Sequence, residues 1–121
     1  MPEPATPLPP DRLHDVASIF GVLGATARLQ ILWLLSAGPR DVGTLAAELD
    51  QSVTAVSQHL AKLKLSGLVR AHRQGRHQIY VVDDAVVAEA VTRIVASRGG
   101  AGAGLPGSVL PGDDADRRGT A

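Results

Sequence analysis

The residues best suited to binding a ligand lie in one segment, from Gln51 to Tyr80. This segment holds five of the 12 Lys and Arg residues and none of the 12 Asp and Glu residues. The rest of the chain therefore has seven basic residues (12 − 5) and 12 acidic ones, so the net charge of zero divides into +5 inside the segment and −5 outside it. A basic segment on a neutral chain indicates a local polyanion site, with a solvated charged surface as the alternative.

An amphipathic helix is predicted inside this segment, capped by Ser52 and ended by Gly67. One of its faces is apolar and is expected to point into the core: Val53, Val56, Leu60 and Leu63. The opposite face carries short hydrogen-bonding side chains and no acid: Gln51, Thr54, Ala55, Gln58 and Lys62, with Ser57 and His59 on its flanks. Gln can read adenine edges, and Ser or Thr can bind phosphates or bases, so this face favours DNA over a protein partner.

A β-hairpin is predicted directly after this helix. Residues 68–72 and 77–82 have the pattern of strands, and Arg73-Gln74-Gly75-Arg76 joins them, with Gly75 able to adopt the positive φ of a tight turn. Arg side chains at its tip can bind the phosphate backbone or enter a minor groove. Helix and hairpin together predict a DNA-binding surface formed by Gln51, Ser52, Thr54, Ala55, Ser57, Gln58, His59, Lys62, Arg73, Gln74, Arg76 and His77.

These elements belong to one predicted domain, because 121 residues suffice for one domain and not for two. Asp11, Asp41 and either Asp83 or Asp84 are expected to cap three further helices. A fifth helix, residues 25–36, is apolar almost all round and should be central and buried. Trp33 on this helix and Phe20 on the helix before it are expected to lie in the core. The predicted fold is mainly α with a small β-hairpin (α+β), a winged helix-turn-helix of order ααααββα.

The two ends are expected to lie outside this fold. The arm, residues 1–10, contains five prolines and is predicted to be flexible, and the domain is predicted to cover residues 11–97. The tail, residues 98–121, is rich in Gly, Pro, Asp and Arg and is predicted to be disordered, because it lacks the apolar residues that offset the entropy of ordering.

Several motifs resemble those of the ArsR/SmtB family of bacterial repressors. Residues 23–32 (LGATARLQIL) are similar to the family's L-x-x-x-T-R-x-x-I-L signature, with Ala27 between the Thr and the Arg. Residues 52–63 (SVTAVSQHLAKL) resemble its recognition helix, S-x-x-x-V-S-x-H-L-x-x-L, and residues 67–70 and 73–76 resemble the entry and tip of its wing. The resemblance spans roughly residues 11 to 96.

This resemblance implies a homodimer that binds double-stranded DNA at a palindromic operator near the gene's own promoter. A two-fold dimer places its recognition helices about one DNA turn apart. The interface that the resemblance implies uses the first and last helices, here Leu13, Val16, Phe20, Val87, Val91 and Ile94.

The metal sites of this family are mostly missing from the sequence. Where one site has cysteines on the third helix, this chain has Val42-Gly43-Thr44-Leu45-Ala46. Where another has Asp-x-His and His-x-x-Glu on the last helix, Asp84 matches the Asp, Val86 stands at the His, and Ser97 and Gly100 stand near the second pair. One ligand of four does not make a metal site.

Nickel-linked members of the family are nonetheless similar in the Pro-rich arm and in the Ile31-Leu32-Trp33 run, which keeps Ni²⁺ or another divalent transition metal open as an effector. His72 and His77 are expected to be direct cross-strand neighbours that could hold such a metal, although DNA contact is the stronger interpretation. His14 could meet Asp83 or Asp84 across a dimer. The candidate ligands are His14, His72, His77 and Asp84.

Three other interpretations remain open. They are a regulator without its own metal site that depends on a partner protein, a regulator that binds DNA constitutively, and a winged helix that serves protein interaction, since fold alone does not settle function. An enzyme is not expected, because no Cys, Gly-rich phosphate loop or Ser–His–acid spacing is present. The absence of Cys, of a long apolar run and of a signal peptide predicts a cytoplasmic protein without a membrane span.

Overall fold

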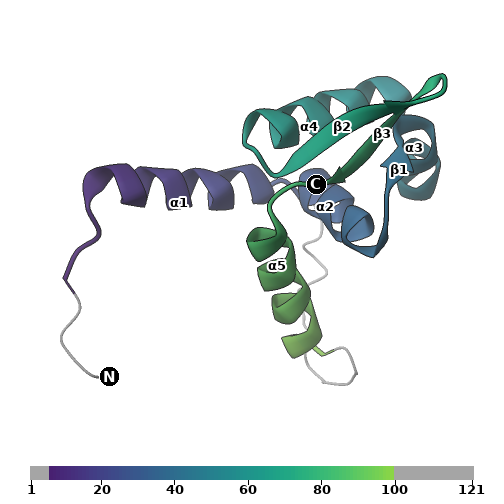
Figure 1. The fold of residues 1–121 in the computed structure, drawn as a ribbon. Coiled ribbons are helices and arrows are strands. Elements are labelled where there is room, and N and C mark those ends of the chain that lie inside the picture. Colours follow the sequence, from purple (N-terminus) through teal and green to yellow (C-terminus); the bar gives the residue numbers. More distant parts are fainter. Residues whose placement is uncertain (1–5, 100–121) are drawn as a thin grey trace.

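Five helices and three short strands make up the part of the chain, residues 6–99, that the computed structural model describes (Figure 1). In chain order they are α1 (Pro10–Leu23), α2 (Thr26–Ala37), β1 (Arg40–Asp41), α3 (Val42–Leu49), α4 (Val53–Leu65), β2 (Val69–Gln74), β3 (His77–Val82) and α5 (Ala85–Ser97). The predicted α+β winged helix-turn-helix is confirmed, and β1 is an additional strand that the sequence analysis missed. The predicted arm up to residue 5 and the predicted tail from residue 100 lie outside the described residues.

Most helix starts follow the capping rules. Asp41 accepts a hydrogen bond from the backbone N–H of α3 at 2.8 Å, Ser52 caps α4 at 3.0 Å, and Asp84 rather than Asp83 caps α5 at 3.1 Å. The expected cap at Asp11 is wrong, because α1 begins at Pro10 and has no side-chain cap. Proline suits the first helical position, since its fixed φ is helical and its missing N–H would have no partner there.

The core forms where α2, α3 and α4 meet the sheet. Its side chains with 0% exposure are Ile31, Leu32, Leu45, Val56, Leu60 and Leu63. Three expected core residues are on the surface instead: Val53 is 50% exposed, Trp33 38% and Phe20 67%. Val53 is the first residue of α4 and projects past the core, and Phe20 belongs to α1, which extends away from the other helices and buries no residue (Figure 1).

The sheet is antiparallel with strand order β1-β3-β2, and β2 and β3 form the wing. Its turn contains only two residues, with Gly75 at φ 64°, the positive value that a type II′ turn requires at its first central position. The tight turn pairs Gln74 with His77 and His72 with Ile79. The expectation that His72 and His77 are direct cross-strand neighbours is therefore wrong, because it assumed a four-residue connection.

No single helix among the described residues is long and apolar enough to cross a membrane. The helices α1 and α2 pass such a test only when taken together, on length and composition, and a 93° bend separates them.

Candidate nucleic-acid interface

The outer face of α4 is held toward solvent by the residues on its inner face. Val56, Leu60 and Leu63 have no exposed surface, and they fix the rotation of the helix about its axis. The exposed side then carries Thr54, Ser57, Gln58 and Lys62, while Ala55 and His59 are half-buried at the flanks. Ser52 begins the helix, and Gln51 is exposed just before it. The structure thus presents the predicted hydrogen-bonding surface, without an acidic residue on α4.

The turn between α3 and α4 sets the angle of the helix-turn-helix. Asp50 ends α3 in the left-handed region at φ 55°, which Asn and Asp tolerate better than most residues. The backbone N–H of the next residue, Gln51, donates to the carbonyl of Ala46 at 3.0 Å. These contacts anchor the start of α4 to the end of α3, so the two helices are placed as one unit.

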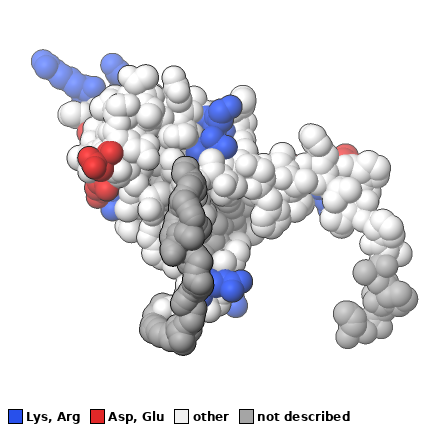
Figure 2. All heavy atoms as spheres, turned by 180° about the vertical axis from the view of Figure 1, so that it is seen from behind, with Lys and Arg blue, Asp and Glu red and all other residues white. Residues whose placement is uncertain are grey.

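The wing carries cationic side chains beyond the body of the molecule. Arg73, Gln74, Arg76 and His77 are all exposed near the turn, and Lys and Arg side chains project at the end of the molecule that holds the wing tip (Figure 2). Within residues 6–99, no acidic side chain forms an ion pair with Arg73 or Arg76. Their positive charge is therefore available to a polyanion.

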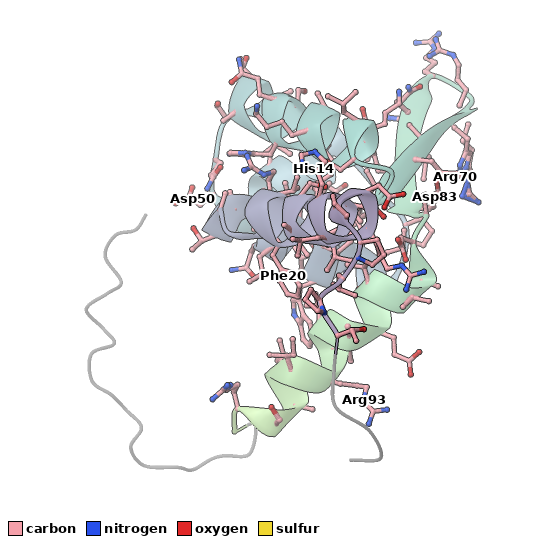
Figure 3. The ribbon with its side chains drawn as sticks, turned by 90° about the vertical axis from the view of Figure 1, so that its left-hand side faces the viewer. His14, Phe20, Asp50, Arg70, Asp83 and Arg93 are labelled. Atoms are coloured by element: carbon pink, nitrogen blue, oxygen red, sulfur yellow. The ribbon has the colours of Figure 1, made fainter. Side chains whose placement is uncertain are left out.

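Arg70, at the base of the wing, is in a different electrostatic environment. Its guanidinium Nη1 lies 3.8 Å from Oδ1 of Asp83, the first residue after β3 (Figure 3). Because an acidic partner partly neutralises Arg70, it adds less to the positive field than the arginines at the tip.

Asp41 joins the helix-turn-helix to the wing. The sequence predicted that Asp41 caps a helix, but it did not predict the contact with the wing. Its Oδ1 accepts the backbone N–H of Thr44, and its Oδ2 lies 3.2 Å from Nδ1 of His77. Hydrogen bonding by the backbone and side chain of Thr44 lowers the pKa of Asp41 below its ordinary 3.8, and the nearby His77 lowers it further, while burial opposes both effects.

The four candidate metal ligands do not converge within a protomer. His14 lies on α1, apart from Asp83 in the view along this helix (Figure 3), and Asp84 caps α5. His72 and His77 share one face of the hairpin only as diagonal neighbours. Among residues 6–99, no three His, Cys, Asp or Glu side chains are grouped so that they could hold a metal ion.

An apolar surface lies where α1 meets α2 and α5, away from the DNA-binding face. Leu13, Val16, Phe20 and Ile94 are 38–67% exposed. Phe20 lies on the α5 side of α1 (Figure 3) and helps to line an apolar groove of about 310 Å³. The other two residues of the predicted interface are more covered, since Val91 belongs to the core of its own protomer and Val87 packs against that core.

The fold and this surface define a winged helix-turn-helix DNA-binding protein, and the comparisons with known proteins identify its family. Residues 26–71 match the family described as "Bacterial regulatory protein, arsR family". The chain is 36% identical over 100 residues to the HTH-type transcriptional regulator KmtR of Mycobacterium tuberculosis, covering 83% of this chain and 77% of KmtR. It therefore belongs to the ArsR/SmtB family of bacterial transcriptional regulators.

Solved structures agree with this assignment. The solution structure of apo-NmtR has a TM-score of 0.66 and 32% identity, covering 92% of each chain. A homodimeric winged helix-turn-helix DNA-binding domain, Mb0332 from Mycobacterium bovis, has a TM-score of 0.65 and 37% identity, covering 73% of this chain and 83% of that one. The relatives are transcriptional regulators, and the prediction that the chain is not an enzyme is confirmed by that membership.

Proposed function

We propose that this chain acts as a homodimer that binds a palindromic operator near its own promoter and controls transcription there. The observation that carries the proposal is the outer face of α4, which is exposed, hydrogen-bonding and free of acid, beside a wing whose tip arginines have no acidic partner among residues 6–99. In this arrangement Gln58 and its neighbours on α4 contact base edges, while Arg73 and Arg76 contact phosphates.

The homodimer is supported by the apolar surface of α1 and by the relative described as homodimeric. An exposed apolar stripe on a helix that has no fully buried residue within its own protomer is typical of an interface. A second copy that covers Leu13, Val16 and Phe20 would also place two α4 helices for the two halves of a palindrome. We place this activity in the cytoplasm, where bacterial DNA lies.

We further propose a divalent transition metal, with Ni²⁺ first, as the effector. The support is family membership alone. Because no three suitable side chains of residues 6–99 are grouped in one protomer, a metal site built from the described residues would need ligands from both protomers. The competing proposal is that the signal comes from a partner protein.

A titration of a fluorescent fragment of the gene's own promoter tests these proposals together. The protein is added first with chelator and then with Ni²⁺, Zn²⁺ or Co²⁺. Specific binding that one metal weakens or strengthens supports a metal-responsive regulator. Specific binding that no metal changes keeps the operator proposal and favours a partner protein, whereas equal binding to unrelated DNA would contradict the operator proposal.

A further inference from the structure

Arg40 on β1 contacts two helices through one guanidinium group. Its Nη1 donates to the backbone carbonyl of Leu34, near the end of α2, and to that of Gly38, just after this helix, at 2.8 Å for Gly38. Its Nε donates to Oε1 of Glu48 on α3 at 2.8 Å. Only 20% of the Arg40 side chain is exposed, so these contacts are largely shielded from solvent.

The end of α2 needs a partner of this kind. The last carbonyls of an α-helix have no partner within the helix, and a cation near them is favourable because that end carries a partial negative charge. The last turn of α2 has no basic residue, so Arg40 supplies the cation from β1. A guanidinium holds its N–H donors in a fixed, planar fork, which lets it bind the helix end and a carboxylate in one geometry.

These contacts lie between the dimerisation side of the protomer and its DNA-binding side. On one side, α2 packs against α1 and α5, the helices of the proposed dimer interface. On the other side, α3 packs against α4, and β1 pairs with β3 of the wing, with Arg40 opposite Tyr80. Figure 1 shows β1 between the end of α2 and the start of α3. Arg40 therefore connects the dimerisation helices to both parts of the DNA-binding surface.

We propose that Arg40, held by Glu48, fixes the angle between the helix-turn-helix and the dimerisation helices, and thereby selects the spacing of the two operator half-sites. This inference rests on the proposed function, because a spacing has meaning only for a dimer on a palindrome. Arg40 is a positioning residue, since its guanidinium binds α2 and α3 and acts on DNA through the placement of α4.

A dimer is sensitive to this angle because both half-sites must fit at once. Each base pair inserted between them increases their separation by about 3.4 Å and rotates one against the other by about 35°. If a variant holds each helix-turn-helix at the competent angle about a third of the time, one half-site is bound about threefold more weakly. A palindrome is then bound about tenfold more weakly, since the fractions of the two protomers multiply. Partial unfolding, in contrast, lowers the amount of active protein equally for both kinds of DNA.

Fluorescence anisotropy with three DNA probes tests the inference. They are the promoter fragment with its half-sites located by footprinting, the same fragment with two base pairs inserted between the half-sites, and the same fragment with one half-site scrambled. Wild type should lose about 100-fold or more in affinity on the insertion, because the second half-site no longer fits. Arg40→Gln and Glu48→Ala should bind the promoter fragment about tenfold and the single half-site about threefold more weakly than wild type. They should lose less than about tenfold on the insertion, because a loosened angle can adapt to it.

Further variants separate positioning from a general loss of charge or stability. Arg93→Gln is the matched control, because it removes an exposed arginine of α5 (Figure 3) that has no ion pair with an acidic side chain of residues 6–99. It should keep the wild-type spacing preference. Arg40→Lys keeps the charge without the fork and should fall between wild type and Arg40→Gln. Melting temperatures and titration at saturating DNA measure the folded and active fractions of each variant.

A wild-type spacing preference in Arg40→Gln and Glu48→Ala would overturn the inference, as would equal losses on the promoter fragment and on the single half-site. If Arg40→Gln does not fold, Glu48→Ala decides, because the Glu48 side chain is 37% exposed and its removal leaves the bonds from Arg40 to α2 in place. Specific wild-type binding that tolerates the insertion would overturn this inference and leave operator binding standing. Absence of specific binding by wild type would overturn the proposed function and the inference with it.

Discussion

Replacement of Arg76 tests whether the wing contributes phosphate contacts. This residue lies in the two-residue turn, is exposed, and has no ion pair with an acidic side chain of residues 6–99. Each phosphate contact contributes about 0.9 to the slope of log affinity against log salt, so Arg76→Ala should lower the magnitude of the slope by about 1.8 for the two wings of a dimer. Phosphate contacts contribute little to affinity near 1 M salt, so wild type and Arg76→Ala should bind almost equally there. A slope difference of about 1.8 then predicts that Arg76→Ala binds about 30-fold more weakly than wild type at about 0.15 M salt.

The assay is fluorescence anisotropy with one promoter fragment at several salt concentrations. Arg70→Ala is the matched control, because it also removes one arginine from the wing but one that lies 3.8 Å from Asp83. Its slope should change by less than half as much as that of Arg76→Ala, since an acidic partner already offsets its charge. An Arg76→Ala slope equal to that of wild type, or a larger change in Arg70→Ala, would refute the placement of the wing on the phosphate backbone.

Three further predictions concern the fold and the dimer. Leu60→Ala replaces a side chain with 0% exposure and should lower the free energy of unfolding in urea by about 2–5 kcal/mol. Leu65→Ala, on the same helix but at 90% exposure, should change it by less than about 0.5 kcal/mol. Similar losses of unfolding free energy in the two variants would contradict the assigned core. Phe20→Glu should convert the dimer to monomer in sedimentation experiments, because it puts a charge on the exposed apolar side of α1, and a dimer that persists unchanged would exclude this interface. The pKa of Asp41 is lowered in the folded protein, so its charge stabilises the fold above the ordinary value of 3.8 and that contribution is lost as the pH falls below it. The melting temperature of wild type should therefore fall more between about pH 4.5 and about pH 2.5 than that of Asp41→Ser, which keeps a capping oxygen; equal falls would show that the charge has no effect.

The parts of the fold that depend on near neighbours in the chain could be predicted from the sequence. Asp41 and Ser52 cap helices because each places an oxygen three residues before a backbone N–H. The buried side of α4 followed from its helical period, and Gly67, at φ 78°, follows that helix as expected. The exposed polar face of α4 was predictable for the same reason, since it lies opposite the buried one.

The parts that depend on contacts between distant segments could not be predicted in this way. Phe20 and Trp33 are apolar in any reading of the sequence, but their exposure depends on where α1 and α5 pack. A difference of two residues in the length of the turn moved His72 from His77 to Ile79. The contact between Asp41 and His77 requires β1 to pair with β3, and a two-residue strand has too little sequence to show a period.

The most direct test of sequence-specific DNA binding compares wild type and Gln58→Ala on the promoter fragment and on a scrambled fragment of equal length. Wild type should prefer the promoter fragment by at least about a thousandfold. Gln58→Ala should lose about 1–3 kcal/mol of that preference while binding scrambled DNA as wild type does, because base contacts give specificity and phosphate contacts do not. Equal affinity of wild type for the two fragments, or an unchanged preference in Gln58→Ala, would contradict the assignment of α4 as the helix that reads the operator.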